Sequence, residues 1–66
     1  MEQKNLEQDY LGLSIEAAQL IAVHRGESIR EAEKDGEALN LTMDYDQHRA
    51  NVATDDDLII RVINYS

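Results

Sequence analysis

The chain has 66 residues, a formal net charge of −8 at pH 7, and neither cysteine nor proline. This length allows one small domain, and the missing cysteines exclude disulfides and thiolate metal sites. The charge disfavours nucleic acids and anionic membrane surfaces as partners and leaves neutral or basic proteins, while no apolar run approaches the roughly 18 residues of a membrane span.

Residues 1–12 are polar and show no clear period, so we expect a flexible or extended arm ahead of a single domain at 13–66. Leu, Ile, Val and Phe account for 16 of the 66 residues, which is typical of a folded chain. The first ten residues contain no apolar h-region. We therefore expect a cytoplasmic protein or an already processed secreted or periplasmic form.

A helix is predicted over 14–25. Ser14 is a favourable N-cap, and His24 and Arg25 place donors in the last turn. Gly26 follows as a residue that readily adopts positive φ. An apolar stripe containing two alanines predicts close packing against a sheet; its members are Ile15, Ala18, Ile21 and Ala22.

The next segment, "SIREAEKDG", carries conflicting signals. Ser28 and Glu31 have the spacing of a capping box, and Gly36 could end a short helix. Local propensity therefore favours a helix over 28–36. Tertiary pairing often overrides such propensity, so a strand remains the alternative.

The stretch "LNLTMDYD", residues 39–46, alternates apolar and polar residues without interruption. This pattern is typical of a half-buried strand. A segment held extended for another protein to bind would show the same pattern. The polar run 44–49 weakens the strand interpretation, because no turn signature follows the alternating residues.

A hairpin is predicted over 50–64. "ANVAT" is a short strand candidate, "DDDL" forms the turn, and "LIIRVIN" is a β-branched run typical of a buried strand. We therefore expect strands near 50–55 and 58–64.

Few residues suggest chemistry of their own. Asp55, Asp56 and Asp57 lack the alternate spacing and closing Glu of calcium loops, so a solvated turn is the better interpretation. His24 and His48 share no metal-ligand spacing. Nothing brings a Ser-His-Asp set together, and a chain this short has little room for a pocket. We expect no metal, no cofactor and no enzymatic activity.

Residues 11–63 together resemble the potato inhibitor I family of serine-protease inhibitors, especially its bacterial and fungal branch. "LGLSIEAAQLIA" is similar to the family's serine-capped, alanine-rich helix, and "LIIRV" to its closing strand. "TMDYDQHRANV" resembles the reactive-site loop and the strand after it. The positions that match the branch pattern Thr-x-Asp-x-Arg-x-Asp-Arg-Leu-Asn-Val are Thr42, Asp44, Arg49, Asn51 and Val52.

The resemblance implies an α+β fold with one α-helix packed on a small mixed β-sheet and an extended reactive-site loop between two parallel strands. It favours a strand over 28–33 and an exposed loop over 39–46, with Met43 at the apex and Leu39 and Leu41 nearer the body. It also implies an inhibitor of chymotrypsin-like or subtilisin-like proteases that is cleaved after Met43, the P1 residue. The implied loop residues are Leu41, Thr42, Met43, Asp44 and Tyr45, and the implied bracing residues are Arg49 and Asn51.

The chain also departs from the family pattern. Asp46 stands where relatives usually have Arg, His48 where they usually have Asp, and Asn51 replaces the second bracing arginine of the plant branch. The run 36–42 is about two residues longer than usual, and a less braced loop is less preorganised for tight binding. The alternative is therefore a non-inhibitory acidic interaction module of the same fold, which binds a partner or itself through a sheet edge.

Overall fold

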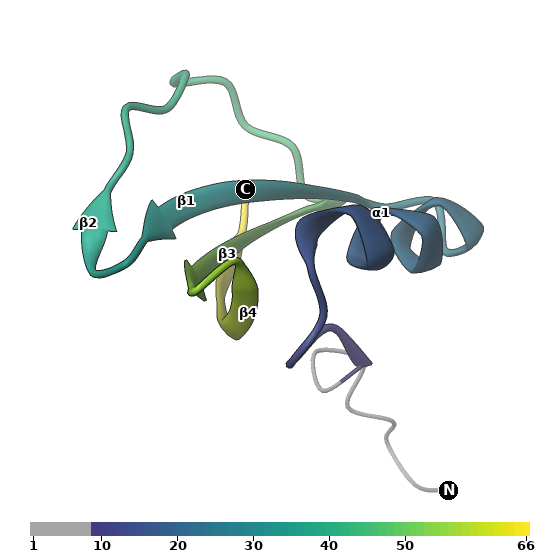
Figure 1. Ribbon diagram of the computed structural model, residues 1–66. Coiled ribbons are helices and arrows are strands. Elements are labelled where there is room, and N and C mark those ends of the chain that lie inside the picture. The colour runs from purple at the N-terminus through teal and green to yellow at the C-terminus, as the bar shows by residue number, and fades with distance from the viewer. Residues whose placement is uncertain (1–8) are drawn as a thin grey trace, which may run out of the picture.

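A computed structural model describes residues 9–66 as one helix packed on a four-stranded mixed sheet (Figure 1). The strand order is β2-β1-β3-β4; β1 and β3 are parallel, and the other two pairs are antiparallel. The predicted α+β class is confirmed. The elements are α1 (Ile15–His24), β1 (Ser28–Lys34), β2 (Glu37–Ala38), β3 (Arg49–Asp55) and β4 (Leu58–Tyr65).

Helix α1 lies within the predicted range 14–25, with the two end residues of that range serving as its caps. The Ser14 side chain caps the helix by accepting a hydrogen bond of 3.1 Å from the backbone N–H of Ala17. Arg25 is the C-cap, and Gly26 has φ +71°, a left-handed conformation that glycine adopts without steric cost. Among residues 9–66, no helix is long and apolar enough to cross a membrane.

Strand β1 settles the conflict over "SIREAEKDG" in favour of the strand. It pairs with β3 along its length, with Arg30 opposite Asn51. Gly36 does not end a helix: Asp35 and Gly36, with φ of 51° and 86°, form a two-residue turn into β2, as in hairpins of type I′. The sequence did not predict β2.

The outer edge of β1 is capped by a side chain of α1. The amide of Gln19 accepts from the Ile29 backbone N–H at 3.2 Å and donates to the Ile29 carbonyl at 3.1 Å. Both backbone groups of Ile29 on this edge are therefore satisfied without a neighbouring strand.

The β3–β4 hairpin is formed as predicted, with a two-residue turn at Asp56 and Asp57. Both turn residues have positive φ, 55° and 67°, which Asp tolerates better than most residues. The pairing shifts register twice, so Ile60 and Ile63 are extra residues in β4. Such bulges interrupt an edge strand and increase its twist.

The core lies between α1 and one face of the sheet. Alternation along β3 directs Ala50 and Val52 into this core and Asn51 toward the opposite face. The buried cluster comprises Tyr10, Ala18, Ala22, Ile29, Ala50, Val52 and Ile59.

The described residues ahead of position 13, which were expected to belong to an arm, pack against the domain. Tyr10 is fully buried and belongs to the core cluster. The segment after it pairs with the edge of β4: Gly12 N–H donates to the Ile59 carbonyl and Ile59 N–H to the Leu13 carbonyl, both over 2.8 Å. Sequence periodicity did not predict the burial of Tyr10, because one apolar residue in a polar segment forms no repeating pattern. The rest of the expected arm, 1–8, lies outside the described residues.

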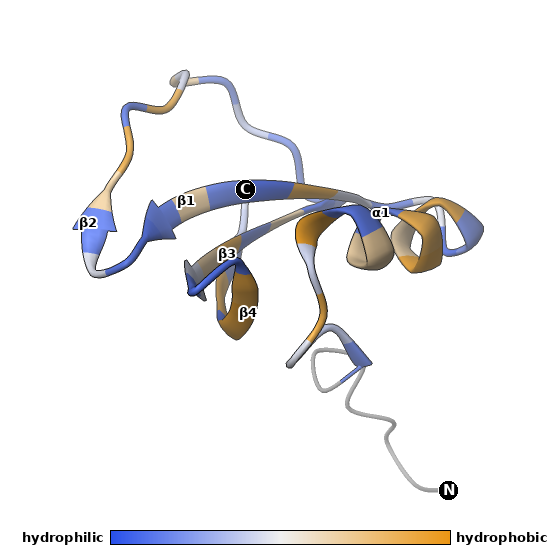
Figure 2. Cartoon of the chain, in the orientation of Figure 1, coloured by the Kyte–Doolittle hydropathy of each residue, from blue (hydrophilic) through white to orange (hydrophobic). Residues whose placement is uncertain are grey.

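The segment 39–48 contains no strand and arches over the face of the sheet opposite α1 (Figure 1). Its alternating hydropathy, visible in Figure 2, thus belongs to an extended loop that joins β2 to β3. The prediction of a loop over 39–46 is confirmed.

Candidate functional site

The apex of the loop is Met43, whose side chain is 97 % exposed. Tyr45 is 72 % exposed, while Leu39 and Leu41 nearer the body are each 38 % exposed. Exposure thus falls from the apex toward the sheet, as expected for a loop whose apex is free to bind a partner. Because this apolar side chain lies in solvent, it contributes no free energy of burial to the stability of the fold.

The residue before the apex is held from strand β1. Arg30 donates from one terminal nitrogen to the Thr42 hydroxyl at 3.2 Å. Its Nε donates to Oδ1 of Asn51 at 2.7 Å. The guanidinium therefore joins the loop to β3, and its planar set of donors allows both contacts at once.

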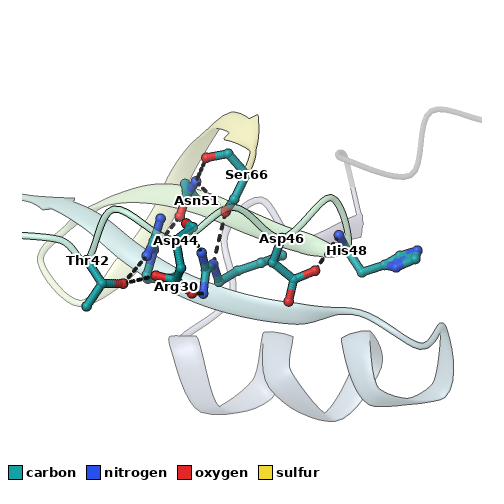
Figure 3. Close-up of polar contacts among 8 residues, drawn as sticks. Arg30, Thr42, Asp44, Asp46, His48, Asn51 and Ser66 are labelled. Atoms are coloured by element: carbon teal, nitrogen blue, oxygen red, sulfur yellow. Dashed lines mark hydrogen bonds and ion pairs between the residues drawn. The ribbon is translucent and has the colours of Figure 1, made fainter.

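The residue after the apex is held from strand β3 (Figure 3). Arg49 donates to the Asp44 carboxylate at 3.2 Å and to the Asp44 carbonyl at 2.9 Å. Its Nε donates to the carbonyl of Ser66 at 2.9 Å. Side chain and backbone of Asp44 are thus fixed by one guanidinium, which is itself oriented by the end of β4.

Thr42 and Asp44 are also bonded to each other across the apex, since the Thr42 hydroxyl donates to the Asp44 carboxylate. This hydrogen bond, followed by that of Arg49, lowers the pKa of Asp44 below its ordinary value of 3.8. Arg30, Thr42, Asp44 and Arg49 therefore form one chain of contacts that brackets Met43. At neutral pH the carboxylate is ionised and accepts from both sides.

A turn returns the loop to the sheet. The Asp46 carboxylate accepts from the backbone N–H of His48 at 2.9 Å, and the Asp46 carbonyl accepts from Arg49 N–H at 3.0 Å. The residue that departs from the family pattern at position 46 thus serves the local turn. His48 is exposed, and its carbonyl accepts from Ser28 at the start of β1.

The guanidinium of Arg49, which the resemblance implies as a bracing residue, lies within hydrogen-bond reach of Asp44. Asn51 was expected to brace the loop, but its contacts are with Arg30 and with the end of β4. Its amide nitrogen donates to Asn64 and to the Ser66 hydroxyl, each at 2.8 Å. Asn51 is therefore a support for the brace and not a part of it.

Sequence reasoning missed Arg30 and Ser66. Arg30 lies in the segment with helical propensity, and only the parallel register with β3 brings it beside Asn51 and beneath Thr42. The resemblance favours a strand over 28–33, but it does not specify the register that places Arg30 opposite Asn51. Ser66 acts through its backbone carbonyl as well as its hydroxyl, and a backbone contact leaves no signal in sequence.

A groove of about 450 Å³ lies at the amino-terminal end of α1 and shares no lining residue with the loop or its brace. Within it, Ser14 caps the helix, Glu31 accepts from Thr54, and Lys34 pairs with Asp57. Among residues 9–66, no cluster of His, Asp or Glu side chains could hold a metal ion.

No protein-family model matches the chain, and neither curated proteins nor solved structures show a significant match to it.

Proposed function

We propose that this chain is a serine-protease inhibitor with Met43 as P1 residue and Met43–Asp44 as scissile bond. One observation carries the proposal: a side chain that is 97 % exposed stands between two residues that are both anchored to the sheet. Such an arrangement exposes a side chain to a protease while the backbone on both sides of it is held in place. Extended segments of this kind bind by pairing with an edge of the partner, as substrates do.

The brace would act both before and after attack on the scissile bond. Before it, the fixed loop loses little conformational entropy on binding, which favours affinity. After it, Asp44 would carry the new amino terminus, and Arg49 holds this residue by its side chain and its carbonyl. The amine then stays close to the acyl carbon, so that religation competes with hydrolysis. This retention would distinguish an inhibitor from a substrate.

The side chains define the kind of target. An unbranched, uncharged Met43 suits an apolar S1 pocket, as in chymotrypsin-like or subtilisin-like proteases. Leu41 and Tyr45 lie on the P3 and P2′ sides and would add apolar contacts. The acidic net charge of −8 favours targets whose surface around the active site is neutral or basic.

The decisive test is a titration of chymotrypsin, subtilisin, elastase and trypsin with the purified protein. We expect inhibition of at least one of the first two and slow cleavage at Met43–Asp44, located by mass spectrometry. The variant Met43→Arg should shift inhibition toward trypsin, because its S1 pocket carries a carboxylate. Rapid cleavage at many other bonds, or no binding by any of the four proteases, would refute the proposal.

A second variant distinguishes a Met43 that binds the protease from a Met43 that stabilises the core. Truncating a core methionine to alanine costs ~2–5 kcal/mol of stability, whereas Met43→Ala should leave the melting midpoint unchanged because the side chain is in solvent. The same change should abolish most binding to a chymotrypsin-like target. A large loss of stability would contradict the role of Met43 as an exposed P1 residue.

The alternative, a non-inhibitory module that binds through a sheet edge, has less support. Edge strand β2 has two residues. The other edge, β4, is interrupted by bulges at Ile60 and Ile63 and is paired with Gly12 and Leu13 at Ile59. Both features limit the addition of a further strand.

A further inference from the structure

We infer that Met43 is a site of reversible oxidation, and that its oxidation switches off protease binding by the loop. The inference rests on the proposed function for its consequence, but the reactivity of the sulfur can be measured without any protease. It assigns the loop a mode of regulation that its brace alone does not imply.

The position of Met43 carries the first step. Among residues 9–66 it is the one sulfur-containing residue, since the chain has no cysteine and its other methionine is Met1. Its side chain is 97 % exposed. The anchored neighbours Thr42 and Asp44 keep the apex away from the sheet, so the thioether cannot withdraw into the core. Oxidation of methionine is governed by access to the sulfur.

The chemistry requires an oxidant of the peroxide class. The thioether sulfur attacks one oxygen of hydrogen peroxide, the O–O bond breaks, and an S–O bond forms. The product is methionine sulfoxide, and the second oxygen leaves as water. Sulfur loses two electrons and the peroxide gains them. A dithiol reductase reverses the step: its thiols become a disulfide and the sulfoxide oxygen leaves as water.

The product has the wrong polarity for an apolar S1 pocket. A sulfoxide carries a strongly accepting oxygen, and burying it without a donor is unfavourable. We expect the inhibition constant to rise roughly ten- to a hundredfold. The fold should be unaffected, because the oxygen is added to a side chain that lies in solvent. Loss of binding without loss of structure is the signature of this switch.

The experiment treats the full chain with hydrogen peroxide and follows it by peptide mass spectrometry. The rate of oxygen addition at Met43 is compared with that of N-acetylmethionine amide under the same conditions. The inhibition constant for chymotrypsin or subtilisin is measured before treatment, after it, and after incubation with a methionine sulfoxide reductase and a dithiol. The melting midpoint is recorded in parallel.

Met43→Leu is the matched control, because it keeps an apolar P1 side chain and leaves Met1 as the one oxidisable methionine. Its inhibition constant should not respond to peroxide. We expect oxidation of Met43 at the rate of the free amide, weaker inhibition, and recovery after reduction.

Three results would overturn the inference. The first is oxidation of Met43 more than about tenfold slower than that of the free amide, which would show a shielded sulfur. The second is complete oxidation with an inhibition constant changed by less than about twofold. The third is an equal peroxide response in Met43→Leu. Absence of inhibition before any peroxide is added would instead refute the proposed function, and the switch with it.

Discussion

Arg30 and Asn51 occupy paired positions on the adjacent parallel strands β1 and β3, and a hydrogen bond of 2.7 Å joins Nε of Arg30 to Oδ1 of Asn51. Asn51 is 3 % exposed and is fixed in turn by Asn64 and Ser66. The loop residue Thr42 therefore contacts a guanidinium whose orientation is set from within the sheet. Two residues outside the loop thus control the shape of its amino-terminal side.

Asn51→Ala should loosen the loop as well as destabilise the fold. Arg30 loses the acceptor for its Nε, and a hydrogen bond to a charged group is worth ~1.5–3 kcal/mol. We expect a lower unfolding free energy and faster cleavage at Met43–Asp44 under native conditions. The matched control is Asn64→Ala, which removes a partner of Asn51 that does not contact Arg30. Cleavage of Asn51→Ala at the wild-type rate would show that the Arg30–Asn51 contact does not shape the loop.

If the chain acts as proposed, Arg49→Ala should turn a slowly cleaved inhibitor into a faster-cleaved substrate. The variant loses both contacts with Asp44, and loss of one charge-assisted bond corresponds to roughly a tenfold effect or more. Arg49→Lys should recover little, because a single ammonium cannot bridge Asp44 and Ser66 in the same way. Arg61→Ala is the control, since Arg61 pairs with Glu33. Unchanged inhibition in Arg49→Ala would assign the brace to Arg30 alone.

The carboxylate of Asp44 should titrate below 3.8, mainly through the Thr42 hydroxyl and next through Arg49. Because its pKa is lowered in the folded state, the contribution of Asp44 to stability is present above the unfolded value and is lost as pH falls through the folded value. Carboxyl chemical shifts followed by NMR against pH give the midpoint. Thr42→Val, which removes the largest cause, should move it back toward 3.8. An unmoved midpoint would contradict the contact between these two side chains.

Gln19→Ala should destabilise the fold although the residue is only half-buried. It removes the partners of both the N–H and the carbonyl of Ile29, and each unsatisfied backbone group costs ~1–3 kcal/mol when buried. Urea unfolding should show the loss, and the Ile29 amide should exchange faster. Leu20→Ala, at a position that is 71 % exposed, serves as control. Similar stability of the two variants would mean that water replaces the Gln19 amide without loss.

Tyr10→Phe should change the response to alkaline pH. Burial of the ring and the hydrogen bond from its hydroxyl to Glu27, 2.8 Å long, raise the pKa of Tyr10 above 10.0. The folded state therefore retains the phenol proton longer than the unfolded state does. Stability should be fully present below pH 10 and should fall as pH rises through the folded pKa.

The variant should lose ~1 kcal/mol at neutral pH with the hydrogen bond and show a shallower decline above pH 10. Tyr45→Phe, altered at an exposed position, provides the control. Parallel alkaline unfolding curves for wild type and Tyr10→Phe would contradict the prediction.

Elements with strong local signals were predictable from sequence. The bounds of α1 follow from Ser14 at its amino-terminal end and from Arg25 and Gly26 at its carboxy-terminal end. These residues act locally, so their effect can be predicted from sequence. Likewise, β4 follows from its β-branched run. Propensity favours a helix over the segment that forms β1, and only the resemblance predicts a strand over 28–33. The strand is stabilised by pairing with β3 and by the cap from Gln19, which are tertiary contacts.

The candidate site was predictable only in part, for a related reason. The contact between Arg49 and Asp44 joins residues five apart in sequence and could be anticipated from the loop pattern. The contact between Arg30 and Thr42 spans twelve residues and depends on a strand register that no local pattern specifies. The burial of Tyr10 gives no local signal, because its ring packs among core residues that are distant in sequence.

The two bracing arginines come from opposite sides of the loop in the chain: Arg30 precedes it and Arg49 follows it. The strands that carry them pair residues far apart in sequence, such as Arg30 and Asn51, which are 21 residues apart. Contacts of this kind carry a large entropy cost of loop closure. The loop is therefore expected to acquire its shape only when the whole domain has folded, and a partly folded chain would present the same residues to a protease as an ordinary substrate. In the presence of a target protease, the lifetime of the protein would be set by how often the entire domain opens. A mutation far from the loop could then shorten that lifetime without touching a single residue of the brace.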